Sequence, residues 1–216
     1  MKDIPIFTAD NGIATLILSE IFHSRRAYVL VRSVWTDAGA LLEECRGFCR
    51  ACGAEEIYAS WETNELPAEH AYDMAEMCCK KADLPAPTRI VELEDLTQAN
   101  GPTYLEIYNS CYHNLPGAAT YGNRDLARLC GEELAYLAKV NGHYAGVAEI
   151  SRKGLEGIAV LPEFHGLGYD LAIAVLNRVP SVNLKLKVAN TNVRARALYE
   201  RLGFRETGIL SRWYVL

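Results

Sequence analysis

Residues 155–204, LEGIAVLPEFHGLGYDLAIAVLNRVPSVNLKLKVANTNVRARALYERLGF, hold the elements that best predict the fold. The short apolar run 155–161 contains β-branched residues and predicts a strand, and Pro162 ends it because proline cannot donate to a ladder. A loop with two glycines follows at 163–170. Residues 171–179 are almost wholly apolar, which is typical of a helix packed under a sheet.

The second half of this stretch predicts another strand and another helix. Apolar and polar residues alternate over 182–188, so one face of the strand is expected to be apolar and the other wet. From Asn192 a helix places three side chains on one stripe, and Gly203 closes it as a left-handed cap; the three are Ala195, Leu198 and Leu202. The unit is β-loop-α-β-α, and a glycine loop feeding a helix N-terminus can hold a phosphorylated ligand.

The composition indicates a globular protein. Half of the 216 residues are hydrophobic, the formal net charge is −5 and the pI is near 5.6. Such a chain lacks the basic field of a constitutive binder of nucleic acid or anionic membranes, so neither partner is expected. The apolar run 12–19 is too short for a signal or a span, and seven cysteines without framework spacing fit reduced thiols. The cytoplasm is the expected location.

The N-terminal part predicts a small α/β domain. A hairpin is expected from strands at 13–20 and 27–35, followed by a helix at 40–52, a strand at 56–61 and a helix at 67–81. The apolar stripe of the first helix consists of Leu41, Cys45, Phe48, Cys49 and Cys52. Because Cys49 and Cys52 then face the core, core packing is favoured over a metal or redox role for this pair. In the second helix, the residues expected to point inward are Ala71, Met74, Ala75 and Cys78.

The stiff connector Leu84-Pro-Ala-Pro-Thr88 predicts a domain boundary, which separates residues 1–86 from 87–216. After it, a strand is expected at 89–93, a tyrosine-rich helix at 102–114 and a short helix that Asn123 caps. Asn141-Gly142 suits the positive φ angles of a type I′ turn between strands 133–140 and 143–150. A last strand is expected at 209–215.

The two parts share an order of elements that suggests an internal repeat. Strand 27–35 and the four elements after it follow the same succession as strand 155–161 and its successors. The first copy has Thr36-Asp-Ala-Gly39 in place of the glycine loop, so no phosphate site is expected there. Duplication and a chance succession of common elements both remain open.

The order β-α-α-β-β-β-α-β-α-β over residues 88–216 resembles the GNAT superfamily of acyl-CoA-dependent N-acyltransferases. The motif that carries the resemblance is Asn192-x-x-Ala195-x-x-Leu198-Tyr199-Glu-Arg-Leu-Gly203-Phe204. The resemblance implies an α/β fold with a mixed sheet, a GNAT-like domain and a smaller α/β N-terminal domain. It also implies acetyl-CoA as co-substrate, no metal, and a small-molecule or peptide amine as acceptor.

The glycine loop departs from the family pattern, which has arginine or glutamine first and glycine or alanine last. The resemblance assigns the CoA pyrophosphate to residues His165, Gly166, Leu167, Gly168, Tyr169 and Asp170. His165 is mostly neutral at pH 7 unless a phosphate raises its pKa, and Asp170 would stand close to the pyrophosphate. Two like charges about 4 Å apart cost about 1 kcal/mol in water and about 4 at a surface-like dielectric. Weakened CoA binding is expected, with tighter binding in Asp170→Gly; the alternative is that Asp170 starts the helix and faces water.

The resemblance also implies roles in catalysis. The main chain of Ile158, Ala159 and Val160 is expected to pair with the pantetheine arm, with an N–H near Val160 polarising the thioester. Asn192 is expected to fix CoA, to cap its helix, or both. Tyr199 matches the family's proton donor to the departing thiolate, although a tyrosine on a packed helix also suits a core.

The catalytic base has two candidates, because Lys187 stands where related enzymes often carry a glutamate. Glu156 is the first candidate, being in phase with Ile158 and Val160, and Glu149 the second. The helix expected to border the acceptor carries tyrosines every fourth residue, which favours either a substrate-binding wall or ordinary packing. These are Tyr104, Tyr108 and Tyr112, and His113 and Tyr121 are further candidates.

The predicted function is therefore the transfer of acetyl from acetyl-CoA to a primary amine by direct attack in a ternary complex. The alternative is a catalytically degenerate protein of the same fold that binds a ligand or a partner.

Overall fold

The computed structural model describes residues 6–113, 115–132 and 134–216, and the chain divides into two compact units. The first unit consists of Met1–Ala75, Ala189–Thr191 and Gly208–Leu216, and the second of Glu76–Val188 and Asn192–Thr207. Two long strands, β5 (Glu69–Lys80) and β11 (Arg205–Val215), contribute residues to both. The predicted domain boundary between residues 86 and 87 falls inside the second unit and stays a prediction.

The first unit is a sheet with the strand order β1-β2-β3-β4-β11. Its other strands are β1 (Ile6–Ala9), β2 (Gly12–Ile17), β3 (Arg26–Val34) and β4 (Glu56–Ser60). The predicted hairpin is confirmed as the antiparallel pair β2 and β3, with the short helix α1 (Ile21–Ser24) between them. The parallel neighbours β3 and β4 are joined by α2 (Ala38–Ala51). The prediction missed β1.

Helix α2 begins where the Asp37 side chain accepts hydrogen bonds from two main-chain N–H groups, and it buries one face against the sheet. Cys45 and Cys49 are fully buried as predicted, and burial raises the pKa of their thiols to about 12 and about 11. The prediction was wrong for Phe48 and Cys52, which are exposed: Phe48 lies beside the buried stripe of Leu41, Leu42, Cys45 and Cys49, and α2 ends before Cys52. Among the described residues no group of side chains forms a metal site.

The helix predicted at 67–81 is wrong, because these residues form strand β5. Glu, Ala and Met favour a helix by intrinsic propensity, but burial here follows the two-residue period of a strand, with Ala75, Met77 and Cys79 buried. β5 lies between β11 and β10 in the sheet, and this pairing overrides the local preference. The element order of the suggested repeat therefore differs at this point, although both units contain a parallel strand pair joined by a helix.

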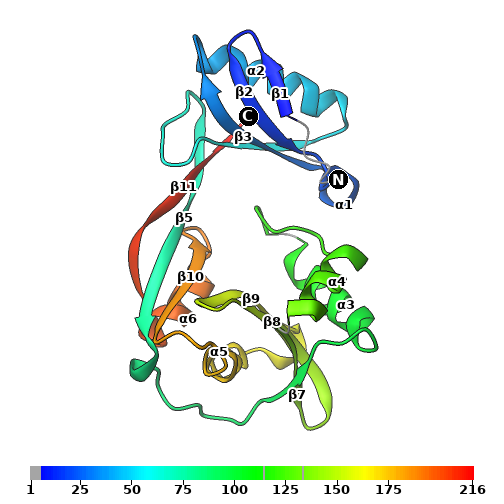
Figure 1. The fold of residues 1–216 in the computed structure, drawn as a ribbon, viewed down its shortest axis with the longest axis vertical. Helices are drawn as coiled ribbons and strands as arrows, with labels where there is room; N and C mark the ends of the chain where they lie inside the picture. The colour runs from blue at the N-terminus through cyan, green and yellow to red at the C-terminus, as the bar shows by residue number, and fades with distance from the viewer. Residues whose placement is uncertain (1–5, 114, 133) are drawn as a thin grey trace. The chain divides into compact units, whose positions relative to one another are not determined.

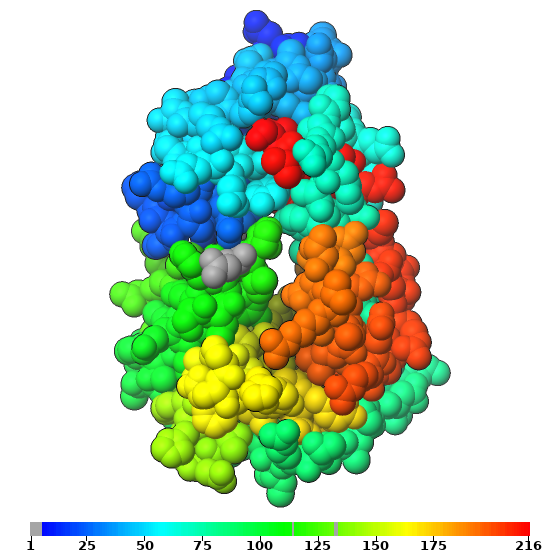
Figure 2. Space-filling model, turned by 180° about the vertical axis from the view of Figure 1, so that it is seen from behind, coloured from blue at the N-terminus to red at the C-terminus, as the bar shows by residue number. Residues whose placement is uncertain are grey.

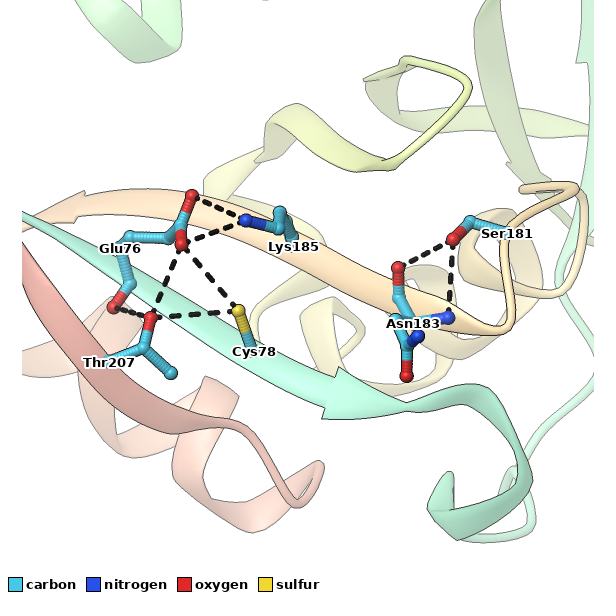
Figure 3. Close-up of polar contacts among 6 residues, drawn as sticks. All are labelled: Glu76, Cys78, Ser181, Asn183, Lys185 and Thr207. Atoms are coloured by element: carbon cyan, nitrogen blue, oxygen red, sulfur yellow. Dashed lines mark hydrogen bonds and ion pairs between the residues drawn. The ribbon is translucent and has the colours of Figure 1, made fainter.

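The face of β5 opposite its buried residues carries a polar cluster (Figure 3). The Lys185 ammonium donates to both carboxylate oxygens of Glu76, at 3.0 and 3.1 Å, and this lowers the pKa of Glu76. The thiol of Cys78 lies 3.8 Å from the same carboxylate and 3.6 Å from the Thr207 hydroxyl. Cys78 was predicted to point inward as part of a helix, and the strand turns it to the other face.

The sheet of the second unit has the strand order β5-β10-β9-β8-β7-β6. Four of these strands run in succession after the connector and the two helices: β7 (Ala135–Val140), β8 (His143–Ile150), β9 (Gly154–Val160) and β10 (Asn183–Ala189). The edge strand β6 (Glu92–Asp95) begins later than predicted. The hairpin of β7 and β8 is confirmed, with positive φ angles of 51° at Asn141 and 79° at Gly142. Leu184, Leu186 and Val188 are buried as predicted, whereas Val182 precedes β10 and is exposed.

In the described part of the second unit there are four helices: α3 (Gly101–Tyr112), α4 (Asn123–Glu132), α5 (Gly168–Leu176) and α6 (Val193–Arg201). Two short 3₁₀ turns, Lys81–Asp83 and Pro162–Phe164, precede the connector and the glycine loop. α3 and α4 pack on one face of β7, β8 and β9, and α5 packs on β8 and β9 from the other (Figure 1). The alternation of strand side chains therefore fills two cores. Gly203 follows α6 with a φ of +93°, as predicted for its left-handed cap.

Candidate functional site

The parallel strands β9 and β10 pair only at the first two residues of β9 and then separate. Gly154 is opposite Lys185 and Leu155 opposite Leu186, and no further pairing joins these two fully described strands. A Cβ built on Gly154 would lie 1.7 Å from the carbonyl oxygen of Lys185, so this close approach requires glycine. The rest of β9 therefore has one main-chain edge that β10 does not cover. In Figure 2, the yellow surface of the segment that contains the end of β9 adjoins the orange surface of the segment that contains β10.

The edge of β9 that β10 leaves uncovered carries the main-chain groups of Ile158 and Val160, and the Cys111 thiol lies 3.7 Å from the Val160 carbonyl oxygen. The N–H of Leu161 donates to the carbonyl oxygen of Ala145 in β8, at 2.9 Å. Because main-chain groups alternate in direction along a strand, those of Ile158 and Val160 point away from β8. Among the described residues no acceptor is found for the Val160 N–H. By the same alternation, the main-chain groups of Ala159, which were also predicted to pair with the ligand, point toward β8, and its side chain is buried in the core on the α3 side.

Tyr112, the last residue of α3, occupies the main-chain groups of Ile158. Its hydroxyl accepts a hydrogen bond from the Ile158 N–H at 2.9 Å and donates one to the Ile158 carbonyl oxygen at 3.0 Å. Burial, together with the nearby Tyr199, raises the pKa of Tyr112. These two groups were predicted to pair with pantetheine, so Tyr112 competes for them. Its four-residue spacing had suggested either a substrate-binding wall or ordinary packing.

The glycine loop forms the N-terminus of α5, as predicted. Gly166 has a φ of +88°, and the predicted phosphate-binding side chain His165 is exposed. The N–H groups of Gly166, Gly168 and Tyr169 have no acceptor in the described part of the chain. Such orphan N–H groups at a helix N-terminus suit an anionic ligand. Leu167 is buried, so it contributes main chain rather than side chain to the loop surface.

Asp170 turns away from the loop and anchors the connector. Its side chain is 1% exposed, and its Oδ1 accepts hydrogen bonds from the N–H groups of Thr88, at 2.6 Å, and Arg89, at 3.1 Å. The Thr88 hydroxyl lies 3.0 Å from both carboxylate oxygens. The alternative that Asp170 faces water is therefore wrong. The expected tightening of CoA binding in Asp170→Gly assumed a carboxylate free to repel phosphate, whereas this one already has partners.

Asn192 is the N-cap of α6, and Tyr199 lies within this helix. The Asn192 side chain accepts a hydrogen bond from the Ala195 N–H at 3.1 Å, which confirms that it caps the helix. Tyr199 is buried in the core with its ring 6.2 Å from that of Phe204, and burial raises its pKa to about 12. Its phenol therefore stays protonated at neutral pH, as a proton donor must.

The two candidate bases lie in contrasting surroundings. Glu156 is exposed on β9, whereas Glu149 on β8 is 8% exposed and accepts a hydrogen bond from the Tyr121 hydroxyl at 2.8 Å. Arg128 lies 3.5 Å from the other oxygen of Glu149. Burial raises the pKa of Glu149, while Tyr121 and Arg128 partly offset the shift. The structure thus gives Glu149 the environment of a tuned carboxylate.

The tyrosines of α3 form a stack with Tyr121. The ring of Tyr108 lies 3.9 Å from that of Tyr121 and 4.4 Å from that of Tyr112, measured between centroids. Tyr104 is fully buried, and its hydroxyl has no partner among the described residues. The stacked tyrosines therefore belong largely to the hydrophobic core, and Glu149 is hydrogen-bonded to one of them, Tyr121.

The separated parallel strands, the mixed sheet and the helices on both of its faces match the fold class that the sequence resembles. The family model described as "Acetyltransferase (GNAT) family" matches residues 93–204. The chain therefore belongs to the GNAT family of acetyltransferases.

Several solved structures share this fold. A functionally unknown conserved protein from Staphylococcus epidermidis ATCC 12228 is 17% identical, with a TM-score of 0.62 over 100% of this chain and 94% of its own. A GCN5-related N-acetyltransferase from Kribbella flavida is 15% identical, with a TM-score of 0.57 over 98% and 88%. A tandem GNAT protein from the clavulanic acid biosynthesis pathway is 16% identical, with a TM-score of 0.55 over 95% and 78%. At these identities the likeness concerns the fold.

No curated protein sequence is similar enough to this chain to count as a match. No helix in the described part of the chain is both long and apolar enough to cross a membrane.

Proposed function

We propose that the protein transfers acetyl from acetyl-CoA to a primary amine by direct attack in a ternary complex. The observation that carries the proposal is the uncovered edge of β9, which leads into a glycine loop whose N–H groups have no acceptor among the described residues. The strand edge suits the amide-bearing pantetheine arm, and the loop suits the pyrophosphate. Holding thioester and amine together supplies much of the rate advantage.

The chain offers groups for each step of this transfer. The N–H of Val160 is available to stabilise the oxyanion of the tetrahedral intermediate. Tyr199 donates a proton to the departing CoA thiolate, since its phenol is neutral up to a pKa of about 12. Asn192 is already committed to its helix cap, and a contact with CoA would use its amide nitrogen.

The acceptor amine must lose a proton before or during the attack. Glu149 is the base best supported by its surroundings, because burial raises its pKa toward that of a useful general base. Glu156 lies on the strand that pairs with β8 and is exposed, so it is the second choice and acts through water in this proposal. Tyr108 lines the same region and contributes to the acceptor side.

One observation favours the alternative of a binding protein without catalysis. The Tyr112 hydroxyl is hydrogen-bonded to both the N–H and the carbonyl oxygen of Ile158, which the pantetheine arm of an acyl-CoA would otherwise use. Under the enzyme hypothesis, either Tyr112 withdraws or the ligand pairs with Val160 alone. The two hypotheses differ in turnover rather than in ligand binding.

A turnover screen decides between them. Amines, amino acids, polyamines and peptides are incubated with acetyl-CoA, and the released CoA thiol is measured. The proposal predicts thiol release that depends on one class of amine and saturates with it. Acetyl-CoA binding without release for any acceptor would support the non-catalytic alternative.

We place the protein in the cytoplasm, because its seven free cysteines suit a reducing compartment.

A further inference from the structure

We propose that Arg89 supplies the positive charge for the CoA diphosphate that the glycine loop itself lacks. This inference rests on the proposed function. The loop carries His165 where a guanidinium or an amide is expected, and within 165–170 its one formal charge at pH 7 is the negative charge of Asp170. A diphosphate bound only by these residues would contact main-chain N–H groups but no positively charged side chain.

The structure places a guanidinium beside this loop from a distant part of the sequence. A Cβ built on Gly166 would lie 3.8 Å from Nη2 of Arg89, so the Arg89 side chain reaches the apex of the loop. The Arg89 side chain is 59% exposed, which leaves its outer N–H groups open to solvent. A guanidinium has five N–H donors and can bind two phosphate oxygens at once.

Asp170 fixes Arg89 in this position through two contacts. Its Oδ1 accepts the main-chain N–H of Arg89 at 3.1 Å, and its Oδ2 lies 3.7 Å from Nε of the same residue. The buried carboxylate therefore anchors both the connector and the base of the side chain, while the far end of the guanidinium faces the loop. A purely structural role would use the same anchor but would give Arg89 no influence on ligand affinity.

The charge balance of the loop changes accordingly. With Arg89 included, Asp170 is paired and the local charge at pH 7 is zero instead of −1. Arg201 adds a second cation nearby, since its guanidinium lies 4.9 Å from the centroid of the Tyr169 ring in the loop. The cation that the family pattern places at the position of His165 is therefore supplied in this chain by Arg89.

The test compares CoA with dephospho-CoA, which keeps the diphosphate and lacks the 3′-phosphate. Calorimetric titrations are made on the wild type, Arg89→Ala, Arg89→Lys and Arg152→Ala, the last being an exposed arginine in the turn that precedes β9. Arg89→Ala is expected to raise the Kd of both ligands about tenfold, which corresponds to about 1.4 kcal/mol. Arg89→Lys is expected to give an intermediate Kd, and Arg152→Ala the wild-type value.

The outcomes separate this inference from the proposed function. Equal Kd values for Arg89→Ala and Arg152→Ala would overturn the inference while leaving the proposed function intact. A loss confined to CoA and absent with dephospho-CoA would assign Arg89 to the 3′-phosphate and also overturn it. A wild type that binds neither ligand would overturn both. Unfolding midpoints without ligand, measured for each variant, show whether a raised Kd reflects an unfolded protein.

Discussion

Replacing Asp170 by alanine tests whether this carboxylate anchors the connector to α5. The side chain is 1% exposed and receives two main-chain N–H groups and one hydroxyl, at 2.6 to 3.1 Å. Hydrogen bonds to charged groups contribute about 1.5 to 3 kcal/mol each. The desolvation of a buried carboxylate costs several kcal/mol and offsets part of this sum.

We therefore expect Asp170→Ala to lower the free energy of unfolding by about 3 kcal/mol, at the high end for a single substitution. Urea denaturation measures this change. Hydrogen exchange adds a local readout, because the N–H groups of Thr88 and Arg89 lose their acceptor and should exchange faster than the rest of the second unit.

Asp37→Ala is the matched control. Asp37 accepts two main-chain N–H groups at the start of α2, but it is exposed, so its loss should cost about 1 kcal/mol. If Asp170→Ala proved as mild as Asp37→Ala, and the exchange of Thr88 stayed slow, the anchoring role would be refuted.

Four further substitutions test the proposed roles. Tyr199→Phe should lower kcat roughly a hundredfold with little change in the Kd of acetyl-CoA, as expected on removing a general acid. Unchanged turnover in a kinetic assay would show that Tyr199 has only a packing role. Tyr112→Phe frees the main-chain groups of Ile158, so calorimetry should show acetyl-CoA bound up to about tenfold more tightly, and weaker binding would show that Tyr112 supports the strand instead. Because burial raises the pKa of Glu149, a base at this position makes kcat/KM rise with pH at a pKa above that of an ordinary carboxyl. Glu149→Gln should abolish this rise and Glu156→Gln should keep it; the reverse pattern would make Glu156 the base.

The fold of the second unit was largely predictable because its signals are local. The alternation of residues 183–188 and the Asn141-Gly142 turn act within a few residues, and the cap at Gly203 follows from its own backbone. Strand β5 shows the limit of this reasoning. Its residues are good helix formers, and only its place between β11 and β10 makes them a strand.

The strand and the loop of the candidate site could be predicted from the sequence, but the residues that hydrogen-bond to them could not. The sequence identified the β9 edge and the glycine loop, because both belong to one continuous stretch. It did not connect Asp170 with Thr88, 82 residues away, or Ile158 with Tyr112, 46 residues away. Contacts at such separations leave no periodic trace in one sequence, and Tyr112 and Arg89 read as an ordinary packed tyrosine and an ordinary exposed arginine.

The central claim, that this fold holds acyl-CoA, is tested most directly by thermal unfolding with and without acetyl-CoA. A ligand that binds only the native state at about 100 times its Kd stabilises that state by about 2.7 kcal/mol. The account predicts a saturable rise of Tm with acetyl-CoA and with CoA. An unchanged Tm at millimolar concentrations of both would contradict it.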